Sequence, residues 1–293
     1  MAVQQLTIDV PDDLKDVLSG ELAEFGAAGI WESGEPNPGF TRLEIYFSSS
    51  PPLEDLRLRV ESLFTQAKYP FPEIRIVDVQ ERDWLEEWKK SYVSFPIGRR
   101  FFIIPSWSES KCPPDRMPIH IDPGQAFGTG THETTQLTLG LLEECPGLRT
   151  SQDQILDLGT GSGILAIAAA LLGFGRVIGC DNDLDSVRVA EENIARNANG
   201  AVSVYCGSID SAPSASVDLL LCNLTAEVIA DLFEEIRRAV RPGGDAILSG
   251  ILIEQRERIH AVVSRGGFSI REERTQGEWL GLAIRKSVDV DGN

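Results

Sequence analysis

The first eighty residues alternate between two hydrophobic periods. Residues 4–10 switch between polar and apolar side chains in period two, as a half-buried strand does, and residues 14–25 then place apolar side chains at helical spacing. Two further strand-like runs flank a Pro- and Gly-rich turn, and a second helical stretch over 53–66 precedes a strand over 73–80. The order β-α-β-β-α-β is typical of a ferredoxin-like split unit. We predict a small α+β domain over residues 1–80.

A connector with two tryptophans separates this region from the next. Trp84 and Trp88 lie four residues apart, on one face of a short expected helix. Such a pair indicates packing against a neighbouring domain rather than a ligand site. Residues 93–107 then show the pattern of a short β-hairpin. We therefore predict a linker over residues 81–106 and a second domain over 107–293.

The second domain repeats strand and helix patterns. Five apolar runs have the pattern of strands and alternate with helical segments: 154–160, 176–181, 202–208, 217–224 and 245–252. Strands with nearly continuous apolar faces, flanked by helices, are typical of a doubly wound parallel α/β sheet. Two later runs, 268–275 and 279–286, have no helix between them. They predict an antiparallel hairpin at one edge of this sheet.

A glycine-rich turn ends the first of these strands. The sequence LDLGTGSG places Gly159, Gly161 and Gly163 where open α/β sheets bind ligands, beside the start of a helix. Asp181 ends the next strand, 22 residues after Gly159, and an acid there can accept hydrogen bonds from both hydroxyls of a ribose. The spacing is G-x-G-x-G rather than the G-x-G-x-x-G of dinucleotide sites. We predict a nucleoside site.

Two other polar residues belong to the same strand ends. Asn223 ends the fourth strand after a wholly apolar run, so that its amide faces the same crevice and offers both a donor and an acceptor. A purely structural asparagine at a strand end is the competing interpretation. Asp157, inside the glycine motif, either meets an amino group of a ligand or braces the turn.

The loop over residues 122–135, DPGQAFGTGTHETT, combines glycines and hydroxyls with few side chains to bury. It is not a zinc-binding H-E-x-x-H motif, because Gln136 stands where the second histidine would be, and it lacks the lysine of a P-loop. No Ser-His-Asp ordering is evident. We predict neither a metal site nor a hydrolase.

Together these segments resemble class I S-adenosyl-L-methionine (AdoMet)-dependent methyltransferases and, more closely, the bacterial ribosomal protein L11 methyltransferase family. The resemblance runs nearly end to end, through DWLEEWKKSYVSFPIGRRFFIIPSW, DPGQAFGTGTHETT, LDLGTGSGILAIAAALLG, CDNDLDSVRVAEENIARN, CNLTAEVI and SGIL. The string AFGTGTH-x-TT is its most specific part. Two places depart from the family pattern: Gln125 stands where the family usually has an apolar residue, and Leu224-Thr225 replaces Ile-Leu.

The resemblance implies a Rossmann-like, doubly wound, mostly parallel seven-stranded methyltransferase sheet, preceded by the ferredoxin-like domain as a substrate-recognition module. It implies AdoMet as the cofactor and methylation of lysine side chains and the N-terminal amine of ribosomal protein L11. Cofactor contacts are implied at Thr135, Gly159, Gly161, Asp181 and Asn223. Phe127 and Thr129 would lie near the sulfonium and the incoming amine, and with Asn223 they are the expected catalytic residues.

Charge and cysteine content narrow the class of protein. The formal net charge of −18 and pI near 4.6 argue against direct binding to a nucleic-acid backbone. Residues 1–60 carry 4 basic and 11 acidic side chains, which suits a basic protein partner as well as plain solubility. The five cysteines show no C-x-x-C spacing, and no apolar run approaches the ~20 residues that span a membrane. We expect a monomeric, cytoplasmic enzyme acting on L11, free or on the large ribosomal subunit.

Two alternatives remain open at this point. One keeps the chemistry and changes the target, to lysines of a protein such as an electron-transfer flavoprotein. The other is a dinucleotide-dependent oxidoreductase or a non-catalytic nucleoside-binding protein, which the glycine spacing and Asn223 disfavour.

Overall fold

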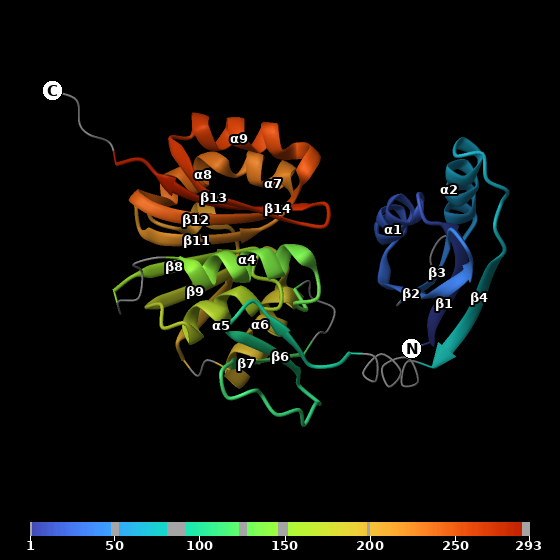
Figure 1. The fold of residues 1–293 in the computed structure, drawn as a ribbon, viewed down its shortest axis with the longest axis horizontal. Helices are drawn as coiled ribbons and strands as arrows, with labels where there is room; N and C mark the ends of the chain where they lie inside the picture. The colour runs from blue at the N-terminus through green and yellow to red at the C-terminus, as the bar shows by residue number, and fades with distance from the viewer. Residues whose placement is uncertain are drawn as a thin grey trace. The chain divides into compact units, whose positions relative to one another are not determined.

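The chain forms two compact units, Met1–Tyr92 and Val93–Asn293 (Figure 1). The computed structural model describes residues 2–47, 53–80, 92–122, 128–145, 152–197 and 200–288. We refer to the two parts as the N-terminal unit and the C-terminal unit.

The N-terminal unit is a four-stranded antiparallel sheet with two helices. Its elements are β1 (Ala2–Pro11), α1 (Lys15–Glu24), β2 (Ala27–Asn37), β3 (Phe40–Phe47), α2 (Leu53–Gln66) and β4 (Ile74–Gln80). This is the element order that the hydrophobic pattern predicted. The strands lie in the order β2-β3-β1-β4, so that β3 is inserted between β1 and β2.

The core of this unit follows from side-chain alternation. Every second residue of β1 and β3 points to one face of the sheet. These residues are buried against α1 and α2, in a cluster of Leu6, Ile8, Val10, Leu18, Leu22, Leu43, Ile45, Phe47, Leu56, Val60 and Phe64. The helices contribute residues four apart, which is the spacing of one helix face.

The C-terminal unit is built on a seven-stranded sheet. Its strands are β8 (Gln154–Leu158), β9 (Arg176–Asp181), β10 (Val202–Cys206), β11 (Val217–Asn223), β12 (Val240–Leu252), β13 (Phe268–Gln276) and β14 (Trp279–Lys286). They lie in the order β10-β9-β8-β11-β12-β14-β13. The first five are parallel, and β14 pairs antiparallel with both β12 and β13. The predicted doubly wound sheet with an antiparallel hairpin at one edge is confirmed.

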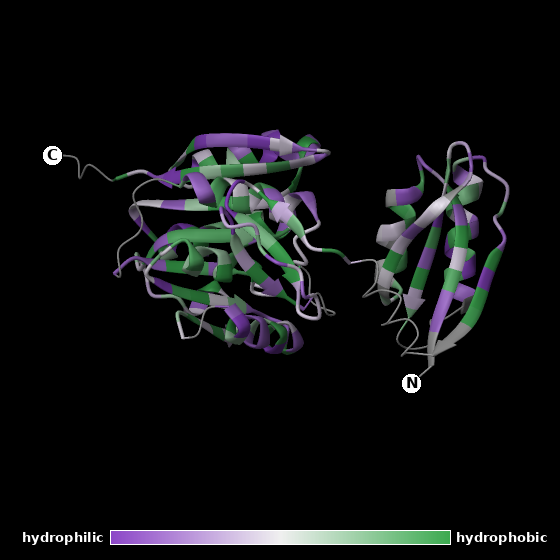
Figure 2. Cartoon of the chain, turned by 60° about the horizontal axis from the view of Figure 1, so that its bottom comes forward, coloured by the Kyte–Doolittle hydropathy of each residue, from purple (hydrophilic) through white to green (hydrophobic). Residues whose placement is uncertain are grey.

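Helices cover both faces of this sheet. One face packs against α4 (Glu133–Glu144), α5 (Ile164–Leu171) and α6 (Leu184–Asn197), and the other against α7 (Ala226–Asp231), α8 (Phe233–Ala239) and α9 (Arg256–Arg265) (Figure 1). Consecutive residues of one strand therefore pack into different hydrophobic cores, one on each face of the sheet. Ile155 and Leu219 lie on the α5 side, and Leu156 and Leu220 on the α8 side. This explains why the inner strands are hydrophobic along most of their length (Figure 2).

Two details of the C-terminal unit differ from the sequence prediction. The apolar spacing over 226–240 is that of one continuous helix, whereas α7 and α8 are separate and meet at Leu232, whose ψ of 3° lies outside the regular helix. The break lets each short helix bury its own apolar side chains against the sheet. The Arg-Pro-Gly-Gly segment at 241–244 has the composition of a turn, but it lies inside β12, where the register with β11 shifts.

A small third sheet belongs to the C-terminal unit. β5 (Phe95–Ile97) and β6 (Phe101–Pro105) form the predicted hairpin, and β7 (Met117–Ile121) pairs parallel with β6. This hairpin falls within 81–106, the range that we expected to be a linker. Its Ile97, Phe101 and Ile103 side chains are buried in the core of the C-terminal unit. The helix expected around Trp84 and Trp88 lies outside the described residues.

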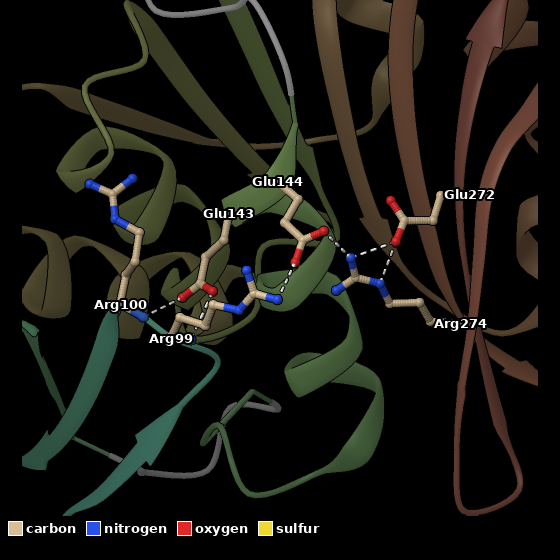
Figure 3. Close-up of polar contacts among 6 residues, drawn as sticks. All are labelled: Arg99, Arg100, Glu143, Glu144, Glu272 and Arg274. Carbon is tan, nitrogen blue, oxygen red and sulfur yellow. Dashed lines mark hydrogen bonds and ion pairs between the residues drawn. The ribbon is translucent and has the colours of Figure 1, made fainter.

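A polar network links the end of α4 to the β5–β6 turn and to β13 (Figure 3). The Glu143 carboxylate accepts hydrogen bonds from the backbone N–H groups of Arg99 and Arg100, at 2.9 and 2.8 Å. Glu144 forms an ion pair of 2.6 Å with Arg274 of β13, which also donates to Glu272. The network therefore holds α4 between the β5–β6 turn and β13.

We expect Glu143→Ala to lower the thermal unfolding midpoint of the C-terminal unit. The substitution removes the carboxylate that accepts both charge-assisted hydrogen bonds. At a half-exposed position this lowers the free energy of unfolding by about 1 kcal/mol. For a unit of this size that loss corresponds to roughly 2–4 °C. Calorimetry of the full chain measures it, with Glu109→Ala in an exposed loop as the control. Equal midpoints for both variants would contradict a structural role for Glu143.

Candidate active site

A cavity of about 510 Å³ opens at the carboxyl ends of the central strands. β9 and β10 lie on one side of β8, and β11 on the other, so the strand order reverses beside β8. Ligands of open α/β sheets bind in the crevice at such a switch point. Seven of its lining residues come from the glycine turn, the ends of β9 and β11, and the start of α4: His132, Thr134, Gly159, Gly161, Asp181, Asn182 and Asn223. Ser186, Ser208 and Thr225 add further hydroxyl groups to the lining.

The glycines of the turn after β8 are required by geometry. Gly159 has φ +71° and Gly163 has φ +82°, in the left-handed region that favours glycine. A Cβ on Gly159 would lie 2.6 Å from Leu224 Cδ2, across the cavity wall. Gly163 caps the start of α5, so the turn also positions that helix.

Asp181 and Gly161 are in contact, although 20 residues separate them. The Gly161 N–H donates to Asp181 Oδ2 at 2.9 Å, and the Asp183 N–H donates to Asp181 Oδ1 at 3.0 Å. A carboxylate oxygen can accept more than one hydrogen bond, so both oxygens retain acceptor capacity toward the cavity. This arrangement can bind a vicinal diol.

Asn223 lies on the opposite side of β8 from Asp181. Its Nδ2 donates to Thr135 Oγ1 over 3.5 Å, a long contact between residues 88 positions apart. Asn223 lines the cavity, whereas Thr135 is fully buried in the first turn of α4, behind it. Thr129 is half-buried, with its Oγ1 2.9 Å from Thr131 Oγ1, and it is not part of the lining. Phe127 and Gln125 lie outside the described residues.

Asp157 stabilises the glycine turn through hydrogen bonds on the side away from the cavity. It is fully buried, and its Oδ2 accepts hydrogen bonds from Thr160 Oγ1 at 2.7 Å and from the Ala166 N–H at 3.1 Å. Oδ1 is buried with no hydrogen-bond partner among the described residues. Burial raises the pKa of Asp157 to about 7, against the effect of these hydrogen bonds. Of the two roles suggested by the sequence, the contacts support bracing.

The loop over 122–135 is attached to the same turn at both of its described ends. Ser162 Oγ donates to the Gly128 carbonyl at 2.6 Å. The buried Asn193 of α6 accepts from the Asp122 N–H at 2.9 Å and donates to the Ser162 carbonyl at 2.9 Å. Asn193 carried no sequence signal, because its role depends on where α6 lies.

Two aromatic rings complete the cavity and were not singled out as site residues from the sequence. His132 caps α4, and its ring lies 5.0 Å from that of Trp279, at the start of β14. His132 Nδ1 accepts from the Thr134 N–H at 3.3 Å, and burial lowers the pKa of the ring. The same Nδ1 lies 2.8 Å from Thr134 Oγ1, so the ring is held by two contacts with Thr134.

The raised pKa of Asp157 predicts a pH dependence of stability. In the unfolded chain this carboxyl ionises near pH 3.8, and in the folded chain near 7. Between these values the folded state holds more protons, so the free energy of unfolding falls as the pH rises from about 4 to about 7. Asp157→Asn should reduce the difference in unfolding midpoint between pH 5 and pH 8. Asp183→Asn is the control, since the pKa of Asp183 is lowered and it stays ionised throughout. If the midpoints of Asp157→Asn at pH 5 and pH 8 differ as much as those of the wild type, the raised pKa of Asp157 is refuted.

Comparison with known proteins agrees with this geometry. The family model described as ribosomal protein L11 methyltransferase (PrmA) matches residues 2–287. A relative named ribosomal protein L11 methyltransferase, from Pelobacter propionicus, is 36% identical over 97% of each chain. Another of that name, from Chloroflexus aurantiacus, is 34% identical over 96% of this chain and 97% of its own.

A solved structure is also similar. It is described as a ribosomal protein L11 methylase from Lactobacillus delbrueckii subsp. bulgaricus, with a TM-score of 0.61 and 34% identity. The match covers 67% of this chain and 100% of that one. The resemblance inferred from the motifs is confirmed, and the C-terminal unit has the methyltransferase fold. The chain belongs to the ribosomal protein L11 methyltransferase (PrmA) family.

Proposed function

We propose that this protein transfers methyl groups from AdoMet to amino groups of ribosomal protein L11, at lysine side chains and at the N-terminal amine. The observation that carries the proposal is the pairing of Asp181 with the glycine turn, in a cavity that Asn223 lines from the other side of β8. Family membership and the names of the relatives support the target. The reaction belongs in the cytoplasm, with no direct contact to nucleic acid.

The residues around the cavity fit AdoMet. A volume of about 510 Å³ lies within the range of roughly 300–1,000 Å³ typical of small-molecule sites. Asp181 accepts from the ribose hydroxyls, and the apolar lining at Leu158, Leu224 and Val228 suits an adenine ring. Cofactor contacts are assigned to Gly159, Gly161, Asp181 and Asn223, which line the cavity. Thr135, buried behind Asn223, is assigned to the cofactor site through its contact with the Asn223 amide.

The chain contributes mainly orientation to the reaction. When bound, AdoMet supplies a methyl group that is already activated by a positively charged sulfur. Holding an acceptor in line with such a group contributes about 7–11 kcal/mol. Because Asn223 Nδ2 points to Thr135, its Oδ1 is the atom that accepts a hydrogen bond from the incoming amine. Phe127 and Thr129, in the adjoining loop, are proposed to enclose the reacting groups.

The acceptor amine has to lose a proton before it reacts. A lysine in water has a pKa of about 10.4, and burial lowers it by disfavouring the charged form. In the described part of the lining we identify no dedicated base: His132 Nδ1 already contacts Thr134, and Asp181 accepts from the backbone of the glycine turn. We assign deprotonation to burial of the amine beside Asn223.

The N-terminal unit is proposed to hold the protein substrate. Residues 1–80 carry 14 acidic and 6 basic side chains, and this excess of negative charge attracts a basic ribosomal protein. The described part of the unit is a folded sheet with its own core. The described lining of the cofactor cavity comes from residues of the C-terminal unit. Binding of the protein and methyl transfer are thus assigned to different units.

Incubation of the purified protein with AdoMet and unmodified L11 tests the function directly. We expect the intact mass of L11 to rise in steps of one methyl group, and peptide mapping then identifies the amines. A protein that binds AdoMet but leaves the mass of L11 unchanged would retain the chemistry and exclude this target. A protein that binds NAD in place of AdoMet would exclude the chemistry as well.

Two substitutions separate the proposed roles of Asp181 and Asn223. Asp181→Asn should weaken AdoMet binding about tenfold or more, because charge-assisted acceptors of the ribose are lost. Asn223→Ala should lower turnover far more than AdoMet affinity, because the amine loses its acceptor. Calorimetric binding and initial rates measure both, with exposed Asp185→Asn on α6 as the control. Unchanged turnover in Asn223→Ala would place the acceptor site elsewhere.

A further inference from the structure

The two edges of the N-terminal sheet are built differently. At one edge, β2 pairs with β3 through three register shifts, between Ala27 and Gly29, Glu32 and Gly34, and Gly34 and Asn37. Such irregularities bend and twist a strand, and they keep an edge from pairing with another chain. At the other edge, β4 pairs with β1 in unbroken register from Ile74 to Gln80. No strand in the described part of the chain pairs with the outer side of β4.

The β4 edge also exposes apolar side chains on both faces. Ile76 is 39% exposed and Val77 is 51% exposed, and consecutive strand residues point to opposite faces. Phe71, just before the strand, is 40% exposed. A regular, apolar edge is a template for an added strand, and proteins usually protect it with charges, prolines or bulges. Between its ends β4 carries two charged residues, Arg75 and Asp78, and no proline.

A groove lies beside this edge, between β4 and α2. Its volume is about 460 Å³, and its apolar lining comes from Leu56, Phe71, Pro72, Ile74 and Ile76. The Arg57 guanidinium lies over the Phe71 ring, 5.5 Å from its centroid, at the rim. An exposed sheet edge beside such a pocket is the arrangement by which proteins bind extended peptides, with main-chain hydrogen bonds for affinity and pockets for alternate side chains.

The negative charge of the N-terminal unit determines which polypeptide segments can bind at this edge. The whole chain has a formal net charge of −18, and residues 1–80 carry 14 acidic against 6 basic side chains. A second copy of the chain is therefore repelled, whereas a basic polypeptide is attracted. The best-matched occupant is an extended segment that is basic overall and has an apolar side chain to place in the groove.

We propose that the β4 edge and the adjoining groove bind an extended, basic segment of the protein substrate as an added strand. This inference rests on the proposed function, because it specifies how the N-terminal unit holds the protein that the C-terminal unit methylates. The added strand would pair with β4 through its backbone and insert an apolar side chain beside Ile76.

The test compares two double variants of the full chain. Ile76→Lys with Val77→Lys places two charges at the β4 edge, as natural proteins do to prevent strand pairing. Val17→Lys with Leu58→Lys adds the same two charges at positions 52% and 64% exposed on α1 and α2, outside the groove lining. The matched charge ensures that any difference comes from the position. Methylation rates are measured against the concentration of unmodified L11.

We expect the edge variant to raise KM for L11 about tenfold or more, while kcat, AdoMet affinity and the unfolding midpoint stay at wild-type values. The control variant should stay within about twofold of wild type, since its positions lie outside the groove. Equal KM values for the two variants would overturn the inference and leave the proposed function standing. Absence of methyl transfer by the wild-type chain would overturn both.

Hydrogen exchange of the wild-type chain provides a second measurement that needs no substitution. Adding unmodified L11 without AdoMet should slow exchange of alternate backbone amides over 74–77, because every second amide of an edge strand points away from its partner strand. Protection confined to other segments would overturn the proposal. Sedimentation of the free chain tests whether a second copy of the chain binds at β4 instead. A wild-type dimer that the edge variant dissociates would show that it does, and would overturn the proposal.

Discussion

Burial of the central sheet on both faces is the constraint on which the C-terminal unit depends. Strands such as β8 and β11 pack against helices on each side, so their central residues are apolar on both faces. Polar groups are left at the strand ends, where the backbone turns and helix starts offer hydrogen-bond donors. Asp181 and Asn223 are the last residues of β9 and β11, and both line the cavity for this reason.

The glycine turn joins that cavity to the core beneath it. Asp157 buries a carboxylate under the turn, which is costly unless hydrogen bonds compensate. Thr160 and the Ala166 N–H supply two of these bonds, and Asp157 thereby fixes both the turn and the start of α5. Asn193 does the same for the 122–135 loop, by linking Asp122 to Ser162. The walls of the cavity are held by buried polar residues that do not themselves line it.

The N-terminal unit follows a different design. Its helices cover one face of an antiparallel sheet, which leaves the other face and the edges accessible. The irregular pairing of β2 and the regular, apolar β4 make the two edges unequal. In the C-terminal unit the edge strand β13 instead carries consecutive charges from Arg271 to Arg274, as protected edges do. The contrast marks β4 as the edge open to a partner.

The order and type of most elements could be read from local patterns, because hydrophobic period reports which side chains a strand or helix buries. The α2 helix, the glycine turn and the ends of β9 and β11 were all evident in this way. The break at Leu232 and the strand through 241–244 were not, since packing against the sheet overrode the local helix and turn signals. The pairing of His132 with Trp279 and the contact of Asn223 with Thr135 join residues far apart in the chain. Local period carries no information about such contacts, because they depend on the order of the strands and the placement of α4, which arise only when the whole sheet is assembled.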